Sequence, residues 1–327
     1  SKTKYPVLSN WYINLDTYYY SFAISFFISI LFYKIKIPKK KITIFDKILT
    51  IFFGYILIPL VLCIPFYFSI YNLTFLDSFF EATSGFTSTG FTIFENIGNI
   101  DQSLIIWRSS TQWLGGLYFL FSIILLIDIY DESFKKTLTN FISFDSSEIF
   151  KQAIKIFLLY SIITLLIFVV LNIFSIRTFD SLNLAFTLIS SGGFLPVNDL
   201  SIILKENSQI VILSMLMLFS FFSIFFCYNL VFIKNKNINF FYEDLHLIVY
   251  YISIVTLFFL FFSFNNNFSY NLLSLSSSIS NIGFSLETNQ SNLNFIFLIL
   301  VIIGGSFFST SSGSVSYTHL RAHETLL

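Results

Sequence analysis

Three short stretches of the chain end on the same Gly-Phe pair: FTSTGF at 86–91, ISSGGF at 189–194 and ISNIGF at 279–284. They lie roughly a hundred residues apart, and a long apolar segment precedes and follows each one. Irregular backbone inside a bilayer is tolerated only where it is buried in protein or lines a water-filled cavity. The three strips therefore predict a pore lined by backbone carbonyl groups.

The composition is that of a membrane protein. Hydrophobic residues make up 55% of the 327 residues and charged residues 11%, whereas a soluble domain carries roughly 25% charged residues. Apolar runs of about 20 residues recur, the length that crosses a hydrocarbon core of ~30 Å. The formal net charge is zero, so no overall field attracts nucleic acid, and the lipid bilayer is the expected surrounding.

Seven apolar segments are candidate membrane spans, at 18–33, 48–71, 104–129, 154–174, 210–233, 245–264 and 295–313. Glycine pairs interrupt two of them, Gly115-Gly116 and Gly304-Gly305. Three shorter amphipathic stretches, at 75–86, 179–189 and 270–279, each run into one strip. A short helix followed by a polar strip is typical of a re-entrant pore loop, and the alternative is an ordinary connector outside the membrane.

The distribution of lysine predicts the orientation, because cytoplasmic loops carry an excess of Lys and Arg. Lysines concentrate in the connections after the first, third and fifth spans: Lys34, Lys36, Lys39, Lys40, Lys41, Lys47, Lys135, Lys136, Lys151, Lys155, Lys234 and Lys236. These connections are therefore expected in the cytoplasm. All three Gly-Phe strips then fall on the outer side.

The order span, short helix, polar strip, span occurs three times in one direction. We therefore expect an all-α polytopic membrane protein built from tandem span–pore-loop–span repeats, preceded by an extra N-terminal transmembrane helix. The expected divisions are 1–47 for that peripheral helix with its basic cytoplasmic loop, 48–150, 151–243 and 244–314 for three pore repeats, and 315–327 for a tail that breaks the pattern.

The chemistry of the strips suits a dehydrated cation, which needs converging oxygen dipoles to replace its water shell. Glycine permits the unusual backbone angles that turn carbonyl groups inward. Neutral oxygens favour a large monovalent ion over Mg²⁺ or Ca²⁺, which seek carboxylates. The alternative for each strip is a glycine hinge or a helix cap. The predicted filter residues are Ser88, Thr89, Gly90, Ser191, Gly192, Gly193, Asn281, Ile282 and Gly283.

Five segments resemble the Trk/Ktr potassium-uptake family, specifically its TrkH-type pore subunits. They are FFEATSGFTSTG at 79–90, WRSSTQWLGG at 107–116, SGGF at 191–194, FYED at 241–244 and GGSFFSTSSG at 304–313. The resemblance spans roughly residues 18–314. It implies a multi-pass protein of the inner (cell) membrane with a pseudo-fourfold pore and potassium as the transported ion, without a cofactor or enzymatic activity. It also implies a homodimer gated by a cytoplasmic nucleotide-binding subunit of TrkA type.

Potassium uptake driven by the membrane potential is the function that the resemblance implies. Sodium-coupled uptake of Ktr type and a non-conducting membrane fragment are the alternatives. The family closes its pore with four repeats, and three are found here, so we expect a C-terminally truncated fragment whose residues 315–327 are not native. His319 and His323 in this tail have helical metal-pair spacing, but no third ligand accompanies them, so no metal site beyond potassium is expected.

The break in the last span predicts a loop beneath the filter that obstructs the pore and moves on activation. Its residues are Gly304, Gly305, Ser306, Ser309, Thr310 and Ser311. The alternative is a small-residue face for helix packing. Two charged residues complete the predictions: Glu81 braces the first pore loop or attracts cations, and Arg108 pairs with Glu95 or Asp101.

Overall fold

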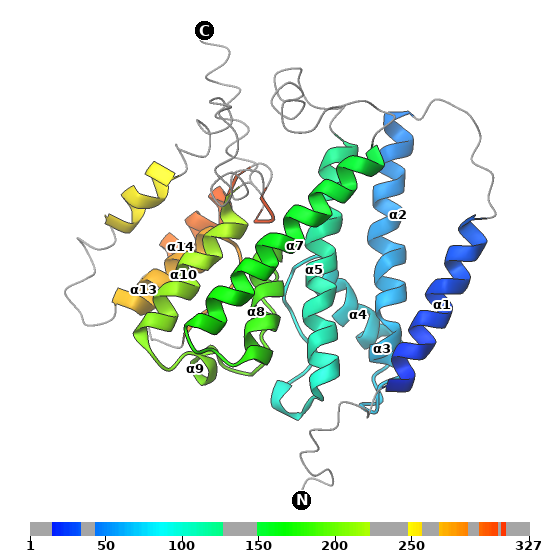
Figure 1. Cartoon of the computed structure of the whole chain (residues 1–327), viewed down its shortest axis with the longest axis horizontal. Helices are drawn as coiled ribbons and strands as arrows, with labels where there is room; N and C mark the ends of the chain where they lie inside the picture. The colour runs from blue at the N-terminus through cyan, green and yellow to red at the C-terminus, as the bar shows by residue number, and fades with distance from the viewer. Residues whose placement is uncertain are drawn as a thin grey trace, which may run out of the picture.

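Every regular element in the described part of the chain is a helix, which confirms the predicted all-α fold (Figure 1). The computed structural model describes residues 15–33, 43–126, 149–222, 248–256, 268–286, 294–306 and 309–311. Most of the lysine-rich connections, the FYED segment and the tail after residue 311 lie outside these residues. The orientation drawn from those lysines therefore remains a prediction.

The described helices lie either in the predicted spans or between them. In the predicted spans lie α1 (Leu15–Tyr33), α2 (Ile44–Leu62) with α3 (Ile64–Tyr67), α5 (Gln102–Leu125), α7 (Ile149–Ile173), α10 (Asn207–Phe221), a helix at 248–256 and α14 (Asn294–Ile303). Between the spans lie α4 (Phe75–Phe86), η1 (Ile97–Asn99), α8 (Thr178–Ser190), α9 (Leu200–Ile203) and α13 (Phe268–Ile279). In Figure 1, α2, α5, α7 and α10 run alternately down and up, and α4 and α8 lie among their lower halves.

The three short amphipathic helices form where the sequence predicts them. Helix α4 has the predicted limits, and α8 and α13 begin and end within two residues of theirs. They contain 12, 13 and 12 residues, which at 1.5 Å per residue is too short to cross a bilayer. Thr74 starts α4, because its side chain accepts a hydrogen bond from the Asp77 amide. Each helix ends at one of the polar strips.

Two helical segments within the described residues are long and apolar enough to cross a membrane, Ile44–Tyr67 and Ala153–Ile173. The first is not one continuous helix, because α2 ends at Leu62 and Pro65 lies at the start of α3. Both segments expose large apolar side chains along their outer faces, including Phe52, Phe53 and Leu165. Such faces suit contact with lipid rather than water.

The Gly115-Gly116 pair does not interrupt its helix, contrary to prediction, since α5 is continuous through both residues. It instead allows close packing. A Cβ at Gly115 would collide with the carbonyl oxygen of Phe86, the last residue of α4. A Cβ at Gly116 would lie 3.1 Å from the Cα of Ser190, the last residue of α8. Helix α5 thus presses against the carboxyl ends of two short helices.

Replacing Gly115 by alanine tests this packing. We expect Gly115→Ala to destabilise the fold by about 1–3 kcal/mol, the usual cost of overpacking, because the Phe86 atoms that its Cβ would meet all belong to the backbone. The measurement is the melting temperature of detergent-solubilised protein, with the loss of folded protein on heating monitored by size-exclusion chromatography. Gly98→Ala is the matched control, since a Cβ there meets only the Asn96 side chain, at 3.2 Å. Equal melting temperatures for the two variants would contradict the assignment.

Candidate functional site

The three Gly-Phe strips adopt the same backbone conformation. A residue with left-handed φ comes first: Ser88 at 55°, Ser191 at 56° and Asn281 at 56°. A glycine with positive φ follows two positions later: Gly90 at 81°, Gly193 at 81° and Gly283 at 80°. Glycine reaches such angles without the steric cost that a side chain adds. The strips are therefore three copies of one turn.

Each turn also ends its helix in the same way. The amide between the left-handed residue and the glycine donates to the carbonyl five residues earlier: Thr89 to Ser84 at 2.9 Å, Gly192 to Thr187 at 2.9 Å, and Ile282 to Ser277 at 3.1 Å. This bond and the left-handed residue define a Schellman motif. The helix-cap alternative therefore describes the local geometry correctly, but it does not account for how the three strips come together.

The strips lie side by side although they are about a hundred residues apart in sequence. A Cβ at Gly90 would lie 2.8 Å from the carbonyl oxygen of Gly192, and one at Gly193 would lie 2.8 Å from that of Ile282. The Ser191 hydroxyl also donates to the Ser280 carbonyl. Among the described residues, nothing lies within 4 Å of a Cβ built at Gly283. The second strip is thus flanked by the first and third, and no described residue covers the far side of the third.

The solvent exposure of the strips agrees with the central position of the second strip. Ser191 and Gly192 in the second strip are buried, whereas Thr87 and Thr89 in the first and Gly283 in the third are exposed. The two outer strips therefore leave one side of the arrangement uncovered within the described residues.

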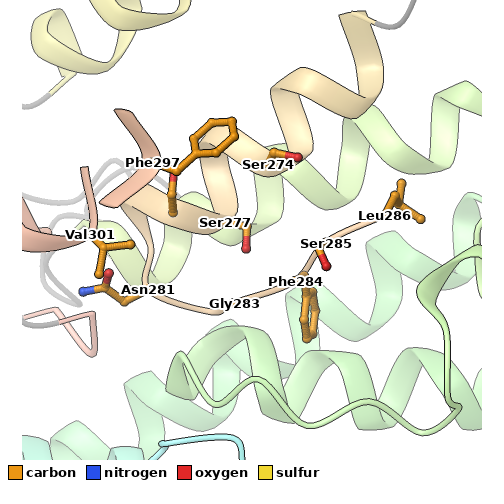
Figure 2. A pocket seen from close by; sticks show the side chains of 10 residues that line it. Ser274, Ser277, Asn281, Gly283, Phe284, Ser285, Leu286, Phe297 and Val301 are labelled. Carbon is orange, nitrogen blue, oxygen red and sulfur yellow. The ribbon is translucent and has the colours of Figure 1, made fainter. Parts of the chain in front are cut away.

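The third strip borders a cavity of about 390 Å³ between α13 and α14, shown in Figure 2. Its lining includes Ser277, Asn281, Phe297 and Val301. In the other two strips, the hydroxyl at the position of Ser277 holds the Phe carbonyl: Ser84 donates to Phe91 at 2.5 Å and Thr187 to Phe194 at 2.9 Å. Ser277 lines the cavity instead, so the third strip is packed less tightly than the others.

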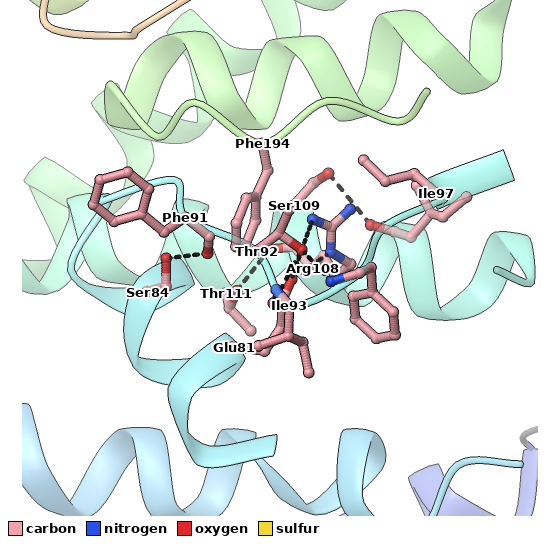
Figure 3. Close-up of polar contacts among 12 residues, drawn as sticks. Glu81, Ser84, Phe91, Thr92, Ile93, Ile97, Arg108, Ser109, Thr111 and Phe194 are labelled. Carbon is pink, nitrogen blue, oxygen red and sulfur yellow. Dashed lines mark hydrogen bonds and ion pairs between the residues drawn. The ribbon is translucent and has the colours of Figure 1, made fainter. Parts of the chain in front are cut away.

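A buried ion pair braces the first strip (Figure 3). The Arg108 Nε lies 2.7 Å from Glu81 Oε1, and the two side chains are 1% and 0% exposed. The Thr92 hydroxyl donates to Glu81 Oε1 at 2.9 Å, and the Ile93 amide donates to Glu81 Oε2 at 3.0 Å. The prediction that Glu81 braces the loop is confirmed by these contacts.

The predicted pairing of Arg108 with Glu95 or Asp101 is wrong, because its partner is Glu81. Asp101 caps the amino end of α5, where its carboxylate accepts a hydrogen bond from the Leu104 amide at 3.2 Å. Arg108 also reaches the second strip. Its Nη1 donates to the Leu195 carbonyl at 3.4 Å, and its guanidinium carbon lies 4.3 Å from the centre of the Phe194 ring.

Gln112 braces the second strip from one helical turn further along α5. Its Nε2 donates to the Gly192 carbonyl, and its Oε1 accepts from the Thr187 hydroxyl at 3.0 Å and the Phe194 amide at 3.3 Å. Any Cβ on Gly192 would collide with this amide. Sequence reasoning assigned Gln112 no role. The available signal was its place four residues after Arg108, on the same face of an apolar helix.

The predicted loop in the last span exists in the described residues. Helix α14 ends at Ile303, and Gly304 has a φ of 66°. The Ser306 amide donates to the Phe221 carbonyl at 2.8 Å, and the Ser311 amide donates to the Ser220 carbonyl at 3.2 Å. These bonds fasten the loop to the carboxyl end of α10. That the loop obstructs a pore remains a prediction.

The assembled strips present neutral oxygens from carbonyls and hydroxyls close to the carboxyl ends of α4, α8 and α13. The carboxyl end of a helix carries about −0.5 elementary charge. The arrangement therefore favours a cation without placing a carboxylate in the strips. The predicted residues of the first, second and third strips are brought together, and the loop residues lie against the second and third strips through Thr310 and Asn281.

Comparison with known proteins gives several relatives, although no family model matches the chain. It is 27% identical over 265 residues to an uncharacterized cation transporter of Methanocaldococcus jannaschii, covering 76% of this chain and 52% of that protein. It is 39% identical over 46 residues to the Trk system potassium uptake protein TrkG of Escherichia coli, covering 14% of this chain and 10% of that protein. It is 25% identical over 129 residues to TrkH of Salmonella typhimurium, covering 38% of this chain and 27% of that protein.

The fold has a solved counterpart. The crystal structure of the potassium transporter TrkH from Vibrio parahaemolyticus superposes with a TM-score of 0.78 at 17% identity, covering 95% of this chain and 68% of that one. The matched regions cover about half the length of the archaeal relative and about a quarter of TrkH from Salmonella. The chain therefore has the fold of the potassium transporter TrkH and is similar in sequence to transporters of the Trk system, which indicates a membrane protein.

Proposed function

We propose that this chain supplies three walls of a potassium-selective pore, through which K⁺ enters the cell across its inner membrane. The observation that carries the proposal is the triple turn: three strips with matching φ angles lie side by side. Relatives named as potassium uptake proteins support the choice of ion. The membrane potential supplies the driving force, worth ~2.3 kcal/mol per charge per 100 mV.

The filter works by replacing water with carbonyl oxygens. A potassium ion sheds its hydration shell only where several oxygen dipoles converge at short range. In this proposal, the positive φ at Gly90, Gly193 and Gly283 allows carbonyls of the strips to turn toward the ion, and the left-handed residues before them set the direction of each strip. The negative ends of α4, α8 and α13 add a favourable field at the inner end of the filter.

A fourth wall completes the pore in this proposal. No described residue covers the far side of Gly283, and Thr87 and Thr89 are exposed on the opposite strip. A further strip with the same turn would fit between them and contact both neighbours as Gly90 and Gly193 do. The repeats at 48–150, 151–243 and 244–314 are the proposed units of this assembly, in a homodimer regulated by a cytoplasmic nucleotide-binding subunit.

The ion pair and Gln112 keep the filter rigid in this scheme. Arg108 and Gln112 both extend from α5, and each holds a carbonyl or an amide of a strip. Since Glu81 and Arg108 are buried, their charges do not face the ion directly. They act by fixing the strip geometry on which discrimination between potassium and sodium depends.

Substituting a filter glycine tests the assignment. In the full-length transporter, Gly193→Ala should reduce the K⁺ over Na⁺ selectivity at least tenfold, because alanine is strained at a φ of 81° and its Cβ would press on the Ile282 carbonyl. The measurement is uptake of each ion by a strain lacking its own potassium transporters. Gly98→Ala is the control. If Gly193→Ala is expressed normally and its selectivity is unchanged, the filter assignment is wrong.

A second measurement, potassium uptake without external sodium, separates potential-driven from sodium-coupled uptake.

Neutralising Glu81 tests the brace. Glu81→Gln leaves the Arg108 guanidinium buried without its counter-charge, and breaking a buried pair from one side typically costs ~3–5 kcal/mol. We therefore expect a lower melting temperature and weaker potassium selectivity. The double variant Glu81→Gln with Arg108→Gln should recover part of the stability, because no unpaired charge remains. If Glu81→Gln melted like the exposed control Glu95→Gln, the ion pair would not be a brace.

A further inference from the structure

The three repeats can be compared at two further positions, one on the short helix and one just after the turn. The first lies nine residues before the positive-φ glycine, and the second lies two residues after it. The residues at these positions are Glu81 and Thr92 in the first repeat, Leu184 and Leu195 in the second, and Ser274 and Ser285 in the third. We call them the support positions.

The first two repeats fill their support positions in different ways. In the first, the Thr92 hydroxyl donates to Glu81 at 2.9 Å, and Arg108 donates to both side chains. In the second, Leu184 is 0% exposed, and Leu195 packs against the same apolar cluster. A hydrogen-bonded ion pair thus supports the first strip, and close apolar packing supports the second.

The third repeat has a cavity at its support positions. Ser274 and Ser285 both line the space of about 390 Å³ between α13 and α14, and Phe297 and Val301 line it from α14 (Figure 2). No charged side chain is among the described residues that line it. Serine is shorter than glutamate or leucine, so the third strip lacks the side-chain volume that supports the other two.

Polar groups of the cavity need partners that the described side chains do not supply. The Asn281 Oδ1 is buried without a hydrogen-bond partner in the described part of the chain, and Asn281 lines the cavity. Ser277, whose counterparts Ser84 and Thr187 hold a Phe carbonyl, lines the same space. An unpaired buried carbonyl is costly, and a polar cavity with room for water normally contains it.

We propose that water fills this cavity and supports the third strip, which makes this strip the most compliant wall of the filter and the one that limits discrimination between potassium and sodium. The inference rests on the proposed function. Sodium is smaller than potassium, so the strip oxygens coordinate it directly only if a wall moves inward. Hydrogen bonds to water re-form during such a movement, whereas a close-packed interior resists it.

Filling the cavity tests this role of water. Ser274→Leu gives the third repeat the leucine that the second repeat carries at the same support position. In the full-length transporter it should raise the ratio of potassium to sodium uptake about fivefold, the population shift that filling one methyl-sized gap produces.

Ser253→Leu is the matched control. The hydroxyls of Ser274 and Ser253 each donate to the carbonyl four residues earlier in their own helix, and Ser253 is exposed and outside the cavity lining. A potassium-to-sodium ratio that is the same in both variants, with Ser274→Leu folded, would overturn the inference.

Thiol labelling detects the water without measuring flux. In a cysteine-free background of the full-length transporter, Ser278→Cys places a thiol in the cavity lining, whereas Ser276 lies outside it and is bonded to the Tyr251 hydroxyl at 3.0 Å. A small water-soluble methanethiosulfonate should modify Ser278→Cys faster than Ser276→Cys, and adding Ser274→Leu should slow the reaction. Equally slow labelling at both positions would show that the cavity is dry or filled by the fourth wall, and the inference would be wrong.

The inference and the proposed function fail in different ways. If Gly193→Ala loses selectivity while Ser274→Leu matches the unmodified protein, the cavity does not limit discrimination and the proposed function stands. If the unmodified transporter does not select potassium over sodium, the proposed function is wrong, and the inference fails with it.

Discussion

The turn that ends each short helix is the constraint on which the rest of the structure depends. A left-handed residue followed two positions later by a glycine near +80° converts a helix end into an extended strip. The same turn occurs at Ser88, Ser191 and Asn281, so three distant segments present matching edges to one another. Helix α5 can reach the ends of α4 and α8 only because Gly115 and Gly116 lack side chains.

Polar groups in this apolar protein are concentrated where they hold the turns. Polar residues inside membranes are expensive and usually functional, and here Glu81, Arg108 and Gln112 are buried and partnered. Helix α5 links two strips, since Arg108 contacts Glu81 behind the first and Leu195 beside the second. The third strip borders a cavity, and its Asn281 is bonded to the loop instead. The third strip, which borders the cavity, is thus the strip whose Asn281 side chain is hydrogen-bonded to the loop.

Much of the fold could be predicted from the sequence because the deciding signals are local. Thr74 caps α4, and the polar strip ends it, so both limits follow from neighbouring residues. The strips can be recognised in the sequence because each requires glycine at one fixed position. The partner of Arg108 and the role of Gln112 could not be found this way, because both depend on which helices meet in three dimensions. The Gly115-Gly116 pair is ambiguous in the sequence for a similar reason, since a helix break and a close helix contact call for the same residue.

The proposed pore requires that the three strips bind a dehydrated monovalent cation along a shared axis. Its most direct test is a structure of the full-length transporter in rubidium, with anomalous scattering used to locate the ion. We predict rubidium density between the three strips, at distances from their oxygen atoms suited to direct coordination and absent when rubidium is replaced by N-methylglucamine. Strips that hold no rubidium, with the ion bound elsewhere in the membrane region, would contradict the account.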